Sequence, residues 1–210
     1  MKTYSLWAGG QIGGIQTSTC SLPCGVQITS QALIVDVLGN THVIGLVKNE
    51  GNQNISLAQL TATFFFSNGT VANASSPFDV ITLRPDLSYA RYELNVTGAN
   101  SPLLCQCPNT DLKIQGNTSH VDILGLYHVV GQVANTGNAL SNFTEVAAAF
   151  YNSSGALIGV GYTSTNPESL PAGQTASFDL TLIAAGSSFN QQVASYLLWA
   201  GGELEPQGLN

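Results

Sequence analysis

Apolar and polar residues alternate with a period of two along most of this chain. The segments His42–Val47 and Leu60–Phe66 are two examples, and neither shows the 3.6-residue period of a helix. Runs of this kind are typical of β-strands that bury one face. Turn-forming residues lie between them, as at Asn68 and Gly69, which both tolerate a positive φ. The pattern predicts an all-β fold of short strands joined by hairpins.

The strand pattern occurs twice. Val35–Asn52 recurs 86 positions later as Val121–Asn138, with eleven of eighteen positions identical, and the same offset pairs Phe64 with Phe150. Self-similarity at a fixed spacing indicates a duplicated structural unit. With five to seven strands expected in each copy, the sequence predicts two tandem β-sandwich domains.

The first residues of the chain repeat its last predicted strand. Tyr4–Gly10 reads YSLWAGG, and Tyr196–Gly202 reads YLLWAGG. The glycine-rich stretch Gly9–Gly14 is interpreted as a hinge, because glycine supplies freedom without packing. We expect a detached strand that either caps its own first domain or adds to a sheet of another copy. Its residues are Tyr4, Ser5, Leu6, Trp7 and Ala8.

The expected domain bounds follow from the repeat and the hinge. They are residues 1–14 for the N-terminal strand and hinge, 15–116 for the first domain and 117–210 for the second. Because strand side chains alternate between faces, Tyr4, Leu6 and Ala8 share one face and Ser5 and Trp7 the other. We expect Leu6 and one of the two aromatic rings to be buried in whichever sheet accepts the strand.

Each copy has the same order of motifs. A Gly-x-Val-x-Asn-x-Gly strand and turn comes first, then an apolar strand ending in aromatics, then an aromatic-acid-Leu strand (Tyr92–Leu94 and Phe178–Leu180). This order resembles the FxLYD-type Ig-like modules of archaeal and bacterial surfaces, over residues 35–96 and 121–182. The resemblance implies Ig-like β-sandwiches outside the cell. It names no activity, since such folds host unrelated functions.

Charged residues are few. They make up 8% of the chain, against roughly 25% in an average protein, and five Lys and Arg residues leave a net charge of -7. Nucleic-acid binding is excluded because no basic patch can form. No apolar run reaches the roughly 18 residues of a membrane span, so no transmembrane segment is expected. The first residues lack the features of a signal peptide, and we expect that an export signal has been removed.

Seven Asn-x-Ser/Thr sequons favour a secreted glycoprotein carrying N-linked glycans. Abundant Asn, Ser and Thr in loops is the alternative explanation. Asn68 and Asn152 are the strongest candidates, because both are expected at hairpin tips where a sugar meets only solvent. The seven positions are Asn54, Asn68, Asn73, Asn95, Asn117, Asn142 and Asn152.

The four cysteines form two tight pairs, Cys20 with Cys24 and Cys105 with Cys107. They allow three complete disulfide pairings. A Cys-x-Cys ring is cramped for disulfide geometry, so cross-pairing between the two clusters is the more comfortable arrangement. A zinc site of four thiolates competes with this, but the usual Cys-x2-Cys spacing is missing. Disulfides would agree with an extracellular location.

No catalytic motif is found in the sequence, so we expect neither an enzyme nor a cofactor nor a bound metal. Nucleophile, zinc-protease and phosphate-loop signatures do not occur. The histidines are expected to have structural or surface roles, and the repeated acids to be turn or strand-edge carboxylates rather than calcium ligands. These residues are His42, His120, His128, Asp36, Asp122, Glu93 and Asp179.

Taken together, a detached N-terminal strand, two sandwich domains, many sequons and few charges resemble the subunits of donor-strand-linked surface filaments. The similarity is greatest to the glycosylated thread filaments of thermoacidophilic archaea. It implies that the tail of each subunit inserts into the next, so that copies of the chain are its partners in an adhesive filament. Low charge suits acidic surroundings, where carboxylates protonate. A monomeric surface module, such as an S-layer-associated binding domain, is the alternative function.

Overall fold

The structure is a computed structural model that describes residues 26–35, 41–50, 57–65, 67–69, 71–75, 91–100, 107–182 and 192–204. These residues form antiparallel strands and turns and contain no helix, which confirms the predicted all-β class. Accordingly, no helix in the described part is long and apolar enough to cross a membrane. The chain divides into two compact units, Met1–Leu103 and Leu104–Asn210.

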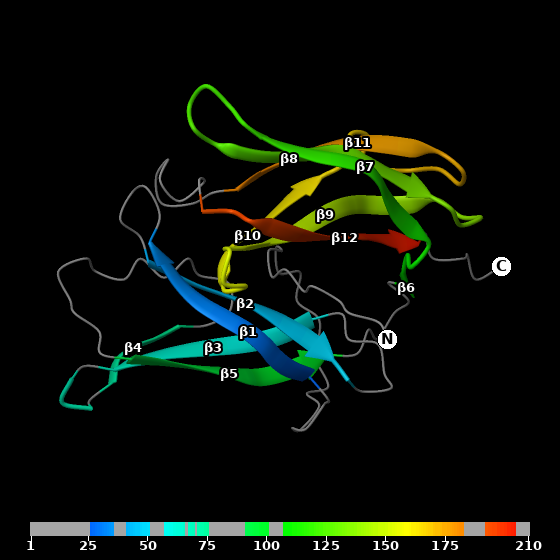
Figure 1. Ribbon diagram of the computed structural model, residues 1–210. Coiled ribbons are helices and arrows are strands. Elements are labelled where there is room, and N and C mark those ends of the chain that lie inside the picture. The colour runs from blue at the N-terminus through cyan, green and yellow to red at the C-terminus, as the bar shows by residue number, and fades with distance from the viewer. Residues whose placement is uncertain are drawn as a thin grey trace. The chain divides into compact units, whose positions relative to one another are not determined.

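Unit 1 contains five described strands in two sheets (Figure 1). Strands β1 and β2 pair with each other, and β3 lies between β4 and β5 in the second sheet. Their bounds are β1 (Val26–Val35), β2 (Thr41–Asn49), β3 (Leu57–Phe65), β4 (Val71–Ser75) and β5 (Arg91–Asn100).

Unit 2 is a two-layer sandwich (Figure 1). One sheet has the strand order β10-β9-β12-β6 and the other the order β11-β8-β7. The bounds are β6 (Cys107–Pro108), β7 (Leu112–Val121), β8 (Tyr127–Asn135), β9 (Ser141–Tyr151), β10 (Leu157–Ser164), β11 (Thr175–Leu182) and β12 (Ser195–Leu204).

The core of unit 2 follows from the period-two pattern. Along β11 every second residue is buried, so Phe178 and Leu180 face the core while Asp179 between them faces outward. Burying each large apolar side chain contributes about 1.5–3 kcal/mol. Apolar residues with no exposed surface come from both sheets and from the segment before β11, which makes the interior continuous between the layers; they are Val129, Val133, Val146, Phe150, Leu170, Leu180 and Leu182.

The repeated Val-x-Asn-x-Gly motif has a structural explanation in unit 2. Asn135 is 1% exposed, and its Nδ2 donates to the backbone oxygens of Ala139 (2.7 Å) and Leu170 (2.9 Å). Its Oδ1 accepts the N–H of Gly137 at 3.1 Å. Buried backbone groups require partners. One asparagine therefore supplies hydrogen bonds to the loop after β8 and to the segment before β11.

The strand bounds repeat but the pairing does not. Shifting β1 and β2 by the 86-residue offset gives the bounds of β7 and β8. The sequence counterpart of β11 is β5, yet β11 pairs with β8 whereas β5 pairs with β3 rather than with β2. The two units thus differ in where this strand is placed.

Candidate functional site

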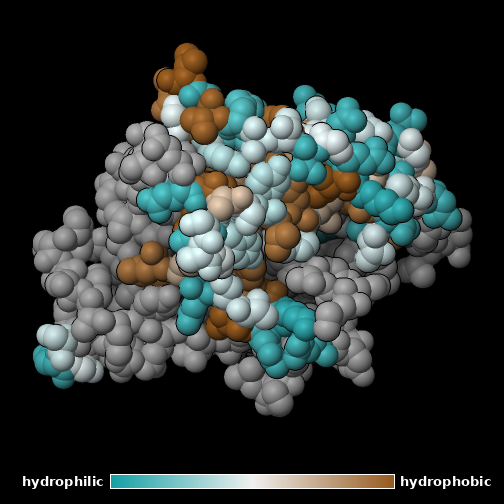
Figure 2. All heavy atoms as spheres, viewed as in Figure 1, coloured by the Kyte–Doolittle hydropathy of each residue, from teal (hydrophilic) through white to brown (hydrophobic). Residues whose placement is uncertain are grey.

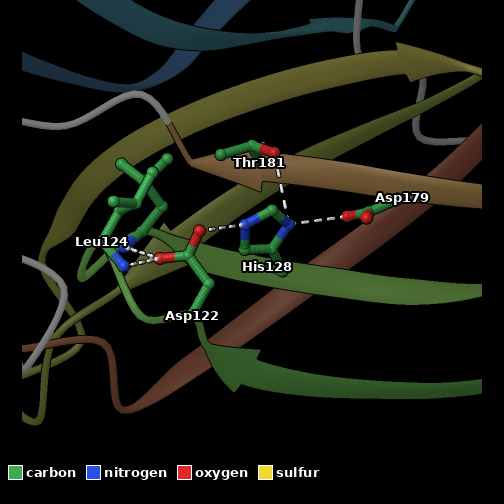
Figure 3. A network of polar contacts seen from close by, with 6 residues as sticks. Asp122, Leu124, His128, Asp179 and Thr181 are labelled. Atoms are coloured by element: carbon green, nitrogen blue, oxygen red, sulfur yellow. Dashed lines mark hydrogen bonds and ion pairs between the residues drawn. The ribbon is translucent and has the colours of Figure 1, made fainter.

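A cluster of polar and charged side chains surrounds His128 on β8 (Figure 3). Its Nδ1 lies 2.8 Å from Oδ1 of Asp179 on β11, and Oγ1 of Thr181 lies 3.3 Å from the same nitrogen. Its Nε2 lies 3.4 Å from Oδ2 of Asp122, in the turn between β7 and β8. The imidazole ring therefore connects this turn to β11.

Asp122 also holds the turn itself in place. Its Oδ1 accepts the backbone N–H groups of Leu124 (2.9 Å) and Leu126 (2.8 Å). Gly125 completes the turn with a φ of 81°, in the left-handed region that favours glycine. Asp122 is thus a turn carboxylate, the role that the sequence indicated for it.

Both nitrogens of His128 face carboxylates, which favours the charged ring. A neutral imidazole has one N–H and one lone pair, so it can donate to only one of the two acids. The buried Nε2 makes no hydrogen bond among the described residues, and its contact with Asp122 is an ion pair that requires a proton on the ring. The hydrogen bond that His128 donates to Asp179 raises the pKa of His128, in spite of the opposing effect of burial.

The pKa of Asp122 shifts in the opposite sense. The backbone N–H of Leu126, more than the histidine, lowers the pKa of Asp122 below its ordinary value. The ring of His120, on β7, stacks on that of His128 with the ring centroids 5.1 Å apart and an angle of 14°. The charged groups facing His128 from the turn and from β11 are therefore Asp122 and Asp179, and His120 covers its ring.

The cluster is suited to holding the turn, β8 and β11 together through the charge of His128, rather than to catalysis or metal binding. Nδ1 of His128 already faces Asp179, so it is not available to activate the hydroxyl of Thr181. No group of three or more His, Cys, Asp or Glu side chains in the described residues could hold a metal ion. What the arrangement can do is make the turn, β8 and β11 depend on the protonation of one histidine.

Sequence reasoning did not bring His128, Asp122 and Asp179 together. The signal was present, because all three have acid or histidine counterparts at the 86-residue offset. The counterparts in unit 1 are His42, Asp36 and Glu93.

Strand β12 shows how the sequence shared with the N-terminus behaves in a sheet. It pairs with β9 along its length but with β6 only at Glu203 and Leu204. Tyr196, Leu198 and Ala200 pack against the core, whereas Leu197 is 53% exposed. The ring of Tyr196 also contacts Phe150, with centroids 6.3 Å apart. In this strand the tyrosine faces the core, and the tryptophan lies on the opposite face.

Several predicted site residues fall outside the described part of the chain. These are the donor residues Tyr4, Ser5, Leu6, Trp7 and Ala8, the sequon Asn54, and the cysteines Cys20, Cys24 and Cys105. Of Cys107 only the backbone is described, opposite Leu204. The predicted disulfides therefore stay predictions.

The remaining sequons lie on strands and turns. Asn68 is exposed in the turn between β3 and β4, and Asn152 begins the turn between β9 and β10, where its Oδ1 accepts the N–H groups of Ser154 and Ala156. Asn117 accepts a hydrogen bond from the hydroxyl of Tyr196, and Asn142 one from Ser169. The other two lie on strands whose side chains are not described; they are Asn73 and Asn95.

A comparison with known protein families found no matching family model, and a comparison with curated proteins found no match. A proposal for the function therefore rests on three features of the chain itself. These are the strand pairing, the internal repeat and the sequence shared by the N-terminus and β12.

Proposed function

We propose that this chain is the structural subunit of an extracellular, glycosylated filament in which each N-terminal strand completes a sheet of the next subunit. The filament would serve adhesion or cell contact. The observation that carries the proposal is the behaviour of β12, whose sequence is repeated at the N-terminus. A segment that resembles a strand already suited to these sheets is a good candidate for strand addition.

The pattern of β12 assigns roles to the donor residues. By correspondence with Tyr196, Leu198 and Ala200, the core-facing residues of the donor are Tyr4, Leu6 and Ala8. Trp7 corresponds to Trp199 on the outer face. Tyr4 rather than Trp7 is therefore the aromatic ring that we expect in the acceptor core. Contact of this head-to-tail kind gives an open filament when successive rotations do not close a ring.

Composition supports the extracellular part of the proposal. A subunit held together by backbone ladders and apolar alternation needs few ion pairs, in agreement with a charged content of 8%. Exposed Asn68 offers a glycosylation point in a turn.

One observation favours the alternative, a monomeric surface-binding module. Ile123 and Leu124, at the tip of the turn between β7 and β8, are 101% and 76% exposed. This turn projects at the top left of Figure 1, and Figure 2 shows apolar atoms protruding there. An exposed apolar tip is a common feature of binding surfaces.

Electron microscopy of native material separates the two functions. We expect filaments from the full chain and folded single subunits with unchanged β-type circular dichroism after removal of residues 1–10. A chain shortened in this way that still polymerises would refute donor-strand assembly. Native material that contains only monomers would favour the surface module. An intact mass equal to the bare polypeptide of 21.9 kDa would remove the glycan part of the proposal.

A further inference from the structure

Unit 1 has five described strands, against seven in the sandwich of unit 2. In unit 2, β9 lies between β10 and β12, and β8 lies between β7 and β11. In unit 1, β3 likewise lies between β4 and β5, but β2 pairs only with β1 within the part of the chain that the structure describes. In unit 1, β3 therefore has a described strand on both sides, whereas β2 has a described strand on one side only.

Strand β5 takes the position in unit 1 that β12 takes in unit 2. It lies antiparallel to β3 in the register that β12 adopts against β9, and apolar residues match pair by pair. The pairs on β3 and β5 are Phe64–Tyr92, Ala62–Leu94 and Leu60–Val96, and those on β9 and β12 are Phe150–Tyr196, Ala148–Leu198 and Val146–Ala200.

By sequence, however, β5 is the counterpart of β11. Tyr92 and Glu93 stand at the offset positions of Phe178 and Asp179. In unit 2 the ring of Phe178 lies so close to Gly131 that a Cβ there would be 2.8 Å from Cζ of the ring. Asp179 binds His128 on the same strand, β8.

The sequence of unit 1 has matching residues for both of these contacts between β11 and β8. Gly45 and His42 on β2 are the counterparts of Gly131 and His128, and Tyr92 and Glu93 on β5 are the counterparts of their partners. In the observed register Glu93 lies opposite Thr63 on β3, not beside β2. The residues that hold β11 against β8 are thus present in unit 1 on strands that do not pair.

These observations identify the acceptor. We propose that the N-terminal segment Tyr4–Gly10 of a second copy binds beside β3 of unit 1, in the position of β12, and that β5 moves to the flank of β2 that no described strand occupies. Tyr4 then lies opposite Phe64, and Leu6 opposite Ala62. Tyr92 lies opposite Gly45, as Phe178 lies opposite Gly131 in unit 2. This inference rests on the proposed function and adds the acceptor strand and the displaced strand to it.

Locking β5 in its present place tests the exchange. Thr63 and Glu93 lie opposite each other on β3 and β5, so the double variant Thr63→Cys, Glu93→Cys can form a disulfide between them. We expect the oxidised variant to form no filaments and the reduced variant to regain them. The matched control joins the equivalent strands of unit 2 through Ala149→Cys and Leu197→Cys, which lie opposite each other and should leave assembly unchanged.

The outcomes distinguish a wrong acceptor strand from a failure of the proposed filament function. If the unmodified chain forms no filaments, the proposed function fails. If the unmodified chain polymerises and the oxidised Thr63→Cys, Glu93→Cys variant does so equally well, the filament stands and the acceptor is wrong. Loss of assembly in the oxidised Ala149→Cys, Leu197→Cys control alone would place the acceptor in unit 2.

A mixing experiment identifies the occupant. A chain carrying Ser5→Cys is mixed with a chain carrying Thr63→Cys, because the exchanged register places these positions opposite each other. Peptide mapping should find a disulfide between the two chains at these residues. If the bond forms only when both substitutions lie in one chain, the segment caps its own subunit and assembly through a second copy is overturned.

Discussion

The substitution His128→Gln should make the stability of unit 2 less dependent on pH. The pKa of His128 is raised in the folded protein, so its charge stabilises the fold below the unfolded pKa of about 6.5. That contribution is lost as the pH rises through the raised folded pKa. Glutamine keeps a hydrogen-bonding side chain but cannot carry the charge. The wild-type advantage at low pH should therefore disappear in the variant.

The size of the effect follows from the exposure of the partners. The His128 side chain is 16% exposed and that of Asp179 is 58% exposed, so solvent screens the pair that dominates the shift. We expect a loss of about 1 kcal/mol, the upper end for partly exposed ion pairs. In a unit of this size that lowers the melting temperature by roughly 4–8 °C. Above the raised pKa, wild type and variant should unfold at similar denaturant concentrations.

Urea unfolding at about pH 5 and about pH 8 measures the difference. Trp199 on β12 reports on unit 2 by fluorescence, in a Trp7→Phe background that removes the other tryptophan. His120→Gln is the matched control, since that ring stacks on His128 without facing the two acids in the same way. An equal loss of stability at both pH values would refute the electrostatic reasoning and leave only a packing role. At the acid limit, the lowered pKa of Asp122 means that its contribution is lost only as the pH falls below its ordinary value of 3.8.

Three further substitutions test packing and assembly. Gly131→Ala should destabilise unit 2 by about 1–3 kcal/mol, because the new Cβ meets the ring of Phe178, whereas Gly201→Ala, with nothing within 4 Å, should be nearly neutral in the same thermal melt. Asn135→Ala should lower the free energy of unfolding by about 1–3 kcal/mol, since a buried carbonyl loses its donor; chemical unfolding measures this. Leu6→Ala should raise the subunit concentration needed for filaments while the circular dichroism of the subunit stays unchanged.

The strands could be predicted from the sequence because their cause is local. Period-two alternation and Asn-Gly turns depend on neighbours along the chain, and the duplicated stretch contains β2 and β8, whose bounds differ by the same 86 positions. Which face of a strand is buried could be predicted in the same way, as the alternating burial of β11 shows.

The pairing of β5 could not be predicted because its sequence fits two positions. Tyr92, Leu94 and Val96 match both the core-facing residues of β11 and those of β12. Alternation determines which face of a strand is buried, but it does not determine which neighbour the strand has. The cluster at His128 was missed for the same reason, since Asp179 lies near the histidine only when β11 is next to β8.

A strand that fits two positions gives the proposed exchange its driving force. In the single subunit, β5 covers the flank of β3, so that an apolar sheet edge is not left open to unwanted pairing. After the exchange, the donor pairs with β3 and β5 pairs with β2, so one β-ladder becomes two. Each added backbone hydrogen bond contributes about 0.5–1.5 kcal/mol net, and the donor also buries Tyr4 and Leu6. Displacement of β5 therefore need not oppose assembly, because the displaced strand gains a new partner in the same step.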